Sequence, residues 1–220
     1  MLDDEERLML SRGHPRTRQE GFSIVELVVT ITVLALILLV AMPSIGNWLA
    51  NTRIRNMAES LQNGLQTARN EAVRRNQNIG FYLVSLTDPA KMDNSCALSD
   101  TGASWVIAAT SPATKCASAP STTTAPMIVS KQAAGSGAVG VKAKHDDDTT
   151  AHTVEFNGLG RVVNADTAIR TIEILGPDAD ASSTAFRPLQ LHVTAAGAVR
   201  LCDPSTALPS NDPRRCPATE

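Results

Sequence analysis

The chain has 220 residues and carries 20 Lys and Arg against 22 Asp and Glu, which gives a formal net charge of −2. This near-neutral balance provides no global argument for nucleic-acid binding, although a local basic cluster is compatible with it. The sequence contains no Gly-x-Ser-x-Gly, His-Glu-x-x-His or phosphate-binding Gly-Lys motif. It therefore predicts neither an enzyme nor a bound cofactor. The length allows one modest globular domain beside a long helix.

A segment without charges extends from Leu27 to Thr52, and it is strongly apolar as far as Met42. About 20 predominantly apolar residues are enough for a helix that spans a membrane. Glu26 lies at the start of this helix, where an ionised side chain costs at least ~2.5 to 3.5 kcal/mol on insertion scales. Such a carboxylate indicates a function that involves a partner. The alternative is a plain signal anchor whose Glu26 lies at the level of the lipid headgroups.

Three basic residues, Arg12, Arg16 and Arg18, precede the apolar segment. By the positive-inside rule they keep the N-terminal segment in the cytoplasm and send the C-terminal domain across the membrane. Residues 3–6 are all acidic, and they weigh little in orientation. Initiation at Met9 instead of Met1 would remove them, and the sequence does not decide between the two starts.

Beyond the apolar segment the pattern becomes that of an amphipathic helix. Apolar residues recur at steps of three and four on one face, at Ile54, Met57, Ala58, Leu61, Leu65, Ala68 and Ala72. Polar residues fill the opposite face, at Arg55, Asn56, Glu59, Gln62, Asn63, Gln66, Asn70 and Arg74. The sequence predicts one helix from Phe22 to about Arg75. Pro43 removes a backbone donor and crowds the carbonyl of Leu39, which predicts a kink or a melted turn there.

From Ile79 onward the period changes to two, which is typical of strands. The predicted strands are Ile79 to Val84, Trp105 to Ala109, Met127 to Ser130, Val139 to Val141, Val154 to Phe156, Arg161 to Val163, Ile169 to Leu175, Leu189 to Val193 and Ala198 to Leu201. Turn signals such as Asn157-Gly158 and Ala196-Gly197 separate several of them. We therefore expect an α+β fold in which the helix packs on an antiparallel sheet.

All four cysteines, Cys96, Cys116, Cys202 and Cys216, follow the apolar segment. They lie on the oxidising side of the membrane, where disulfides persist. Four cysteines allow three connectivities, and sequence alone does not choose between them. We favour Cys96 with Cys116 and Cys202 with Cys216, because each pair brackets a loop rich in Pro, Ser and Thr.

The densest polar cluster is His145-Asp146-Asp147-Asp148. Oxygen ligands suit calcium, but three consecutive Asp residues cannot all point inward without flanking ligands, so a solvated loop is favoured. A zinc site is the rival interpretation of the cysteines. There is no Cys-x-x-Cys spacing, and His145, His152 and His192 show no ligand pattern, so no metal site is predicted.

The residues Gly21-Phe22-Ser23-Ile24-Val25-Glu26 and the apolar run that follows closely resemble the prepilin signature of type IV pilins and of the pseudopilins of type II secretion systems. The resemblance implies that a prepilin peptidase cuts between Gly21 and Phe22 and that the new amine of Phe22 is methylated. It also implies that Glu26 pairs with the Phe22 amine of a neighbouring subunit during assembly. Pro43 lies where pilin helices of this family often bend or unwind within the filament.

Three local matches resemble the FimT/GspH group of minor pilins and minor pseudopilins. They are Ala68 to Asn76, Val154 to Arg161, and Leu189 to Cys202 with the later Asp212-Pro213-Arg214-Arg215-Cys216. The resemblance implies the type IV pilin-like fold and a structural subunit of the inner membrane that assembles with other pilins into a pilus and sits at or near its tip. The alternative is a minor pseudopilin of a type II secretion system. Sequence does not separate the two.

Some FimT-type pilins bind DNA during natural transformation through a C-terminal Gly-Arg-x-Arg element. The matching positions here read Gly197-Ala198-Val199-Arg200, so one of the two arginines is missing. The remaining candidates for a phosphate-binding patch are Arg187, Arg200, Arg214 and Arg215. The alternative interpretation is that these are ordinary exposed arginines.

Together these features predict four segments. Residues 1–21 form a prepilin leader peptide, and residues 22–50 form the transmembrane half of the helix. Residues 51–77 form its amphipathic half. Residues 78–220 form a periplasmic antiparallel β domain with a C-terminal cysteine loop.

Overall fold

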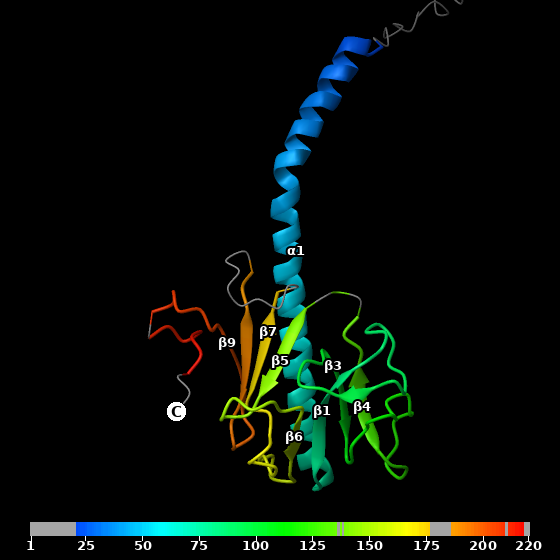
Figure 1. Cartoon of the computed structure of the whole chain (residues 1–220), viewed down its shortest axis with the longest axis vertical. Coiled ribbons are helices and arrows are strands. Elements are labelled where there is room, and N and C mark those ends of the chain that lie inside the picture. The colour runs from blue at the N-terminus through cyan, green and yellow to red at the C-terminus, as the bar shows by residue number, and fades with distance from the viewer. Residues whose placement is uncertain (1–20, 136, 138, 177–185, 210, 218–220) are drawn as a thin grey trace, which may run out of the picture. The chain divides into compact units, whose positions relative to one another are not determined.

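The computed structural model describes residues 21–135, 137, 139–176, 186–209 and 211–217, without the side chains of residues 40–44. The chain divides into two compact units, Met1–Ser44 and Ile45–Glu220. Within the described residues the elements are one helix, α1, followed by nine strands, β1 to β9 (Figure 1). This order agrees with the predicted fold class, a long N-terminal helix before an antiparallel β domain.

The helix α1 extends over Ile24–Arg75. At its C-terminal end Asn76 adopts a positive φ of 50°. The amide of Asn76 donates to the carbonyl of Val73 and that of Gln77 donates to the carbonyl of Ala72, at 3.3 and 3.2 Å. This is a Schellman motif, in which an Asn takes the left-handed position that ends a helix. The helix therefore ends where the sequence predicts.

The helical backbone continues through Pro43 without a break. The described backbone therefore shows no melted turn at Pro43, which is compatible with the loss of a single ladder hydrogen bond at a proline, and the kink stays a prediction. The side chain of Pro43 lies outside the described residues.

Within the described residues, no helix has the combination of length and apolar character that crossing a membrane requires. The side chains of residues 40–44 fall inside the predicted span, residues 22–50, and lie outside the described residues. The membrane span therefore stays a prediction.

The first sheet is centred on β1 (Ile79–Ser85). Its order is β2 (Ala97–Leu98), β1, β3 (Ser104–Ala108) and β4 (Ile128–Gln132), and β6 (Thr153–Phe156) also pairs with β1. All of these pairs are antiparallel. β2 was not predicted, because a strand of two residues has no measurable period.

The second sheet has the order β5 (Gly140–Lys144), β7 (Thr171–Leu175), β8 (Leu189–Val193) and β9 (Val199–Cys202), again with antiparallel pairs only. Figure 1 shows β9, β7 and β5 to the left of β1, β3 and β4, with both groups beside the C-terminal half of α1. The antiparallel arrangement is the one that the sequence predicts.

One predicted strand, Arg161 to Val163, is wrong. Val162 forms only an isolated bridge with Phe156. The reason is the path of the backbone, because the amide of Val162 donates to the carbonyl of Ala195, at 3.1 Å, in the turn between β8 and β9. This segment therefore links the two sheets instead of extending either one.

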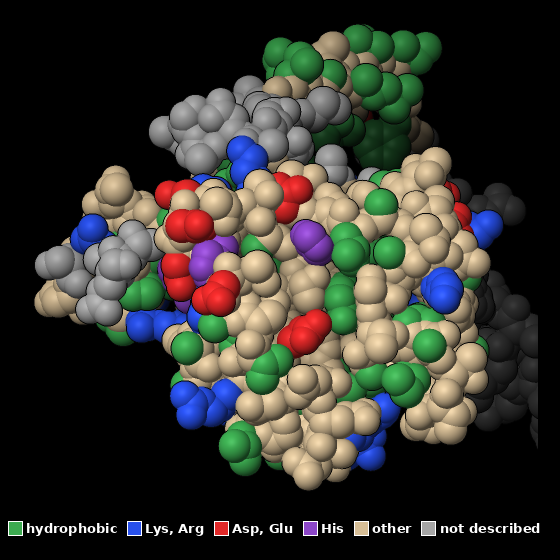
Figure 2. Space-filling model, turned by 60° about the horizontal axis from the view of Figure 1, so that its bottom comes forward, with side chains coloured by type: hydrophobic (Ala, Val, Ile, Leu, Met, Phe, Trp, Pro, Cys, Tyr) green, Lys and Arg blue, Asp and Glu red, His purple; other side chains and the backbone are tan. Residues whose placement is uncertain are grey.

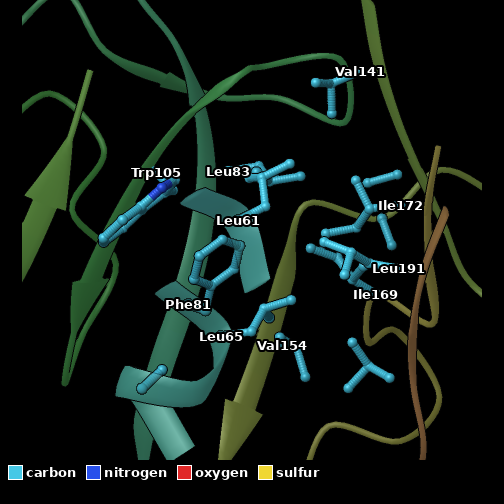
Figure 3. Close-up of a cluster of buried hydrophobic side chains, with 14 of the residues drawn as sticks. Leu61, Leu65, Phe81, Leu83, Trp105, Val141, Val154, Ile169, Ile172 and Leu191 are labelled. Atoms are coloured by element: carbon cyan, nitrogen blue, oxygen red, sulfur yellow. The ribbon is translucent and has the colours of Figure 1, made fainter. Parts of the chain in front are cut away.

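The hydrophobic core lies between the amphipathic half of α1 and the two sheets (Figure 3). All seven apolar residues that the sequence assigns to the inner face of the helix are buried, at Ile54, Met57, Ala58, Leu61, Leu65, Ala68 and Ala72. They meet side chains of the first sheet such as Phe81 and Leu83, and side chains of the second sheet such as Ile172 and Leu191. The amphipathic half of α1 thus contributes side chains to one hydrophobic core that it shares with both sheets.

An aromatic pair fixes the helix against the first sheet. The rings of Phe81 and Trp105 are 5.8 Å apart between centroids, and Nε1 of Trp105 donates to Oγ of Ser60 at 3.1 Å. A Cβ at Gly64 would lie 2.8 Å from the Phe81 ring and 3.0 Å from that of Trp105. Gly64 therefore allows both rings to lie directly against the helix backbone.

A second, smaller cluster covers the other face of the first sheet and includes the disulfide between Cys96 and Cys116. Nζ of Lys131 donates to the carbonyls of Cys116 and Ser118, at 2.6 and 2.9 Å, and burial lowers the pKa of this ammonium. The loop after Cys96 is therefore held by a covalent bond and by a charged side chain from β4.

Candidate functional site

The first candidate site is the N-terminal end of α1. Oγ of Ser23 accepts a hydrogen bond from the amide of Val25, at 3.3 Å, and so caps the helix. Glu26 lies in the first turn, exposed, and the side chain of Phe22 is 84% exposed. The carboxylate of Glu26 and the side chain of Phe22, the residue after the predicted cleavage point, therefore both lie exposed at the N-terminal end of α1.

Gly21 has no structural reason to be a glycine within the described chain. Among the described residues, a Cβ at this position would meet nothing within 4 Å. Cleavage after Gly21 stays a prediction of the prepilin resemblance.

The helix that follows is hydrophobic on all sides and is exposed on all sides. Its large apolar side chains range from 42% exposed at Leu49 to 81% at Ile24. Uniformly apolar helices are otherwise found buried in large proteins or in membranes. The described side chains of the N-terminal half of α1 therefore form an exposed apolar surface.

The second candidate site is the C-terminal loop, which the disulfide between Cys202 and Cys216 closes. The backbone amide of Asp203 donates to the carbonyl of Arg214 at 2.7 Å, and the amide of Cys216 donates to the carbonyl of Asp203 at 3.1 Å. The last described residues thus run beside the end of β9. Both disulfides have the pairing that the sequence favours.

Three of the four candidate DNA-binding arginines donate hydrogen bonds within this loop. Nη2 of Arg200 donates to the carbonyl of Pro213 at 2.7 Å. Arg214 forms a two-point contact with Asp212, at 3.1 and 2.8 Å, and this contact lowers the pKa of Asp212 to about 2. Nη1 of Arg215 donates to the carbonyl of Leu208 at 3.2 Å. These groups therefore hold the loop together, and among the described residues only Arg214 of the three lies against a carboxylate.

Arg187 precedes β8, and its backbone amide donates to Oδ1 of Asn51 on α1, at 2.8 Å. It thus belongs to the contact between the second sheet and the helix. DNA binding by these four arginines stays a prediction.

A polar pocket of about 370 Å³ lies on the outer face of the second sheet, between the turn after β5 and the C-terminal loop. Figure 2 shows carboxylate and histidine side chains gathered together on one face of the molecule. Nζ of Lys144 lies 3.4 Å from Glu173 and 3.3 Å from Asp148, and Glu173 is the main reason that the pKa of Lys144 is raised. The lysine is thus the counter-ion of the carboxylates around it.

The aspartates of the predicted solvated loop each have their own protein partner. Asp146 forms an ion pair with Arg170 at 3.3 Å, and Asp148 forms one with Lys144. Oδ1 of Asp147 accepts the amide of Thr149 at 3.0 Å. These contacts make a turn whose carboxylates are paired with groups of the same domain.

Sequence reasoning missed the position of His192. Burial, followed by the charge of Arg200, lowers the pKa of His192. Its ring lies beside the C-terminal disulfide, and the ligand atoms of His192, Cys202 and Cys216 all lie within 4.8 Å of one another. The feature that brings His192 near these cysteines is the pairing of β8 with β9, in which His192 lies opposite Arg200 and Gln190 lies opposite Cys202. A search for local ligand spacing does not detect neighbours on paired strands.

Residues 57–215 match the family described as type II transport protein GspH, and residues 16–42 match the prokaryotic N-terminal methylation motif. Among solved structures, the chain is similar to the type IV minor pilin FimU of Pseudomonas aeruginosa strain PAO1 in two crystal forms. For the first crystal form, in space group P21, the sequence identity is 18% and the TM-score is 0.43. The match covers 68% of this chain and 88% of the FimU chain. For the second crystal form, in space group P65, the sequence identity is 17% and the TM-score is 0.41. The match covers 67% of this chain and 90% of the FimU chain. No curated protein matches the sequence.

Proposed function

The chain belongs to the GspH family of pilin-like proteins, and on that premise we propose that it is a minor structural subunit of a type IV pilus. In this proposal a prepilin peptidase cuts the precursor after Gly21. The N-terminal half of α1 first anchors the mature chain in the inner membrane, with the β domain in the periplasm. It then packs among the helices of other pilins in the filament.

The single observation that carries the proposal is the exposed apolar surface of α1 before Ala50. Each buried CH₂ contributes about 0.8 kcal/mol, so a helix with many exposed Leu, Ile and Val side chains has a strong drive to leave water. Both a bilayer and a bundle of similar helices satisfy it. A subunit that moves from membrane to filament exchanges one apolar environment for the other.

The charge of Glu26 determines which group of a neighbouring subunit it contacts in the proposed assembly. A carboxylate in an apolar bundle is expensive unless a positive group neutralises it. Cleavage before Phe22 would create such a group, a new amine, at the same end of the helix. Because the carboxylate and the amine lie at one end of each chain, we propose that Glu26 of one subunit pairs with the Phe22 amine of the next.

Processing is tested with two glycine variants of the full-length chain. We expect Gly21→Val to accumulate as the uncut precursor, because the added side chain enters the predicted recognition position. The matched control is Gly46→Ala, since a Cβ at Gly46 also meets nothing within 4 Å. We expect this control to be cut normally. Mass spectrometry of the membrane fraction reads the outcome, and a Gly21→Val chain that begins with a methylated Phe22 would contradict the proposal.

A second candidate function is that of a minor pseudopilin in a type II secretion system. The description of the matched family, a type II transport protein, favours it. The physical argument about α1 is the same for both filaments. Deletion of the gene distinguishes them, because we expect loss of surface pili in the first case and accumulation of exported proteins in the periplasm in the second.

A further inference from the structure

Three potential metal ligands meet at the edge of the polar pocket. They are His192 on β8, Cys202 at the end of β9 and Cys216 in the C-terminal loop, with all ligand atoms within 4.8 Å of one another. Among the described residues this is the one group of His, Cys, Asp and Glu side chains that could hold a metal ion. A turn joins β8, which carries His192, to β9, which ends at Cys202. Cys216 follows Cys202 by 14 residues.

In the disulfide form neither sulfur can bind a metal as a thiolate. The chain is, however, synthesised with thiols, and the disulfide forms only when an external oxidant removes protons and electrons from them. Before that event, Cys202 and Cys216 supply two thiolates next to one imidazole. Zinc binds Cys sulfur at about 2.3 Å and His nitrogen at about 2.0 to 2.1 Å in tetrahedral geometry, so its ligand atoms lie roughly 3.5 to 4 Å apart. In the disulfide the sulfur atoms of Cys202 and Cys216 are 2.05 Å apart, so once the bond opens they must move apart by roughly 1.5 to 2 Å to reach that geometry.

The backbone holds these ligands together independently of the sulfur–sulfur bond. His192 is fixed by the register of β8 and β9, in which it lies opposite Arg200. Cys216 is held beside the end of β9 by the hydrogen bond from its amide to the carbonyl of Asp203. Arg200 also donates to the carbonyl of Pro213 in the same loop. Opening the disulfide therefore leaves several contacts that keep the thiols near the imidazole.

The polar pocket offers room for a fourth ligand. His192 and Cys216 line it, together with the carboxylates of Asp146, Asp148 and Glu173. A water molecule or a carboxylate in this pocket could complete a tetrahedral site. The negative charge of the carboxylates favours a bound cation. It also offsets the positive charge of Lys144 and Arg215, which line the same pocket.

We propose that the dithiol form of this chain binds one Zn²⁺ ion through Cys202, Cys216 and His192, and that the ion holds the C-terminal loop closed until exchange with an external protein disulfide, which accepts two electrons and becomes a dithiol, forms the Cys202–Cys216 bond and releases Zn²⁺ to solvent. On binding, the thiol protons pass to solvent and no electron is transferred. The Cys96 and Cys116 pair has no histidine in such a group, so it is not expected to bind zinc.

The test uses the full-length chain in detergent micelles, with Cys96→Ala and Cys116→Ala so that only the C-terminal pair remains. A phosphine reduces this pair without acting as a thiol ligand, and Co²⁺ serves as the spectroscopic probe. We expect one Co²⁺ per chain, with thiolate-to-cobalt absorption and tetrahedral d–d bands that Zn²⁺ abolishes by displacement. The disulfide form of the same variant should give neither signal.

Two histidine variants identify the third ligand. We expect His192→Ala to weaken Co²⁺ binding by at least about tenfold, because even outer-shell changes cost about 10- to 100-fold in affinity. The control is His145→Ala, because His145 lines the same pocket but its Nδ1 donates to the carbonyl of Ala168, at 2.9 Å. It should bind like the parent. Equal binding by the disulfide form would overturn the proposal, and so would unchanged spectra and affinity in His192→Ala. Circular dichroism checks folding, and thiolate absorption from an unfolded reduced chain counts against the site.

Discussion

The two halves of α1 share one backbone and have opposite surfaces. Every described side chain from Ile24 to Leu49 is exposed, although nearly all are apolar. From Ala50 to Arg75 the helix has one buried apolar face and one polar face. The second half is therefore explained by the packing of the chain on itself. In the function proposed above, the first half is explained by an apolar environment outside the chain.

This difference separates two kinds of mutational effect. A change on the inner face of the second half should alter the stability of the β domain. A change on the first half should leave that stability unaltered and alter the behaviour of the chain in membranes or filaments. The predictions below use residue pairs on the two halves to test this separation.

The largest effect is expected for Leu61→Ala, because Leu61 is fully buried between the helix and both sheets. Removal of a buried Leu side chain costs about 2 to 5 kcal/mol of unfolding free energy. The matched change is Leu36→Ala on the first half, where the side chain is 64% exposed. We expect it to leave the unfolding free energy of the β domain unchanged. Urea unfolding followed by Trp fluorescence measures both, and equal losses would contradict the separation.

A smaller effect is expected for Gly64→Ala. The new Cβ would lie 2.8 Å from the Phe81 ring, and both rings are held in the core. Overpacking of this kind costs about 1 to 3 kcal/mol, and the better helix propensity of Ala returns about 1 kcal/mol. Gly46→Ala is the control, since it gains propensity without a contact. Thermal unfolding should show a lower Tm for Gly64→Ala alone, and a Tm equal to or above that of the parent would show that the rings can move.

The smallest effect concerns Glu71, near the end of the amphipathic half. The hydrogen bond from Arg74, with help from Arg75, lowers the pKa of Glu71. A carboxylate whose pKa is lower in the folded state stabilises the fold above its unfolded pKa, near 4.5, and loses that contribution as the pH falls through the folded value. Because Arg74 is largely exposed, the contribution should be below about 1 kcal/mol.

Glu71→Gln should therefore be slightly less stable than the parent at neutral pH, and the difference should shrink as the pH falls below about 4.5. Urea unfolding at a series of pH values measures it. A difference that is independent of pH would show that shape, and not charge, is what Glu71 contributes.

Much of this architecture could be predicted from the sequence. The spacing of Ile54, Leu61 and Leu65 gives the buried face of the helix, because a helix repeats every 3.6 residues whatever surrounds it. The period of two gives most of the strands in the same way. The cysteine pairing that the sequence favours among three connectivities, because each pair brackets a loop rich in Pro, Ser and Thr, is the one observed.

The C-terminal site could not be predicted in this way. The neighbourhood of His192 depends on the register between β8 and β9 and on the path of the tail, neither of which has a local signature. The arginines were predicted from their charge, but Arg214 lies against Asp212 and Arg200 against a backbone carbonyl. A charge pattern does not show which partners a folded loop provides.

The central claim is that the first half of α1 is an assembly helix whose Glu26 is neutralised by another subunit. The most direct measurement is the amount of full-length Glu26→Gln chain that enters filaments, relative to the parent, when both are inserted in the membrane at equal levels. The matched control is Glu59→Gln, an exposed Glu on the second half of the same helix. Leaving a buried charge without its partner costs about 3 to 5 kcal/mol, so incorporation of Glu26→Gln should fall at least about tenfold, while cleavage and the Glu59→Gln control remain normal. Incorporation of Glu26→Gln at the level of the parent would contradict the account.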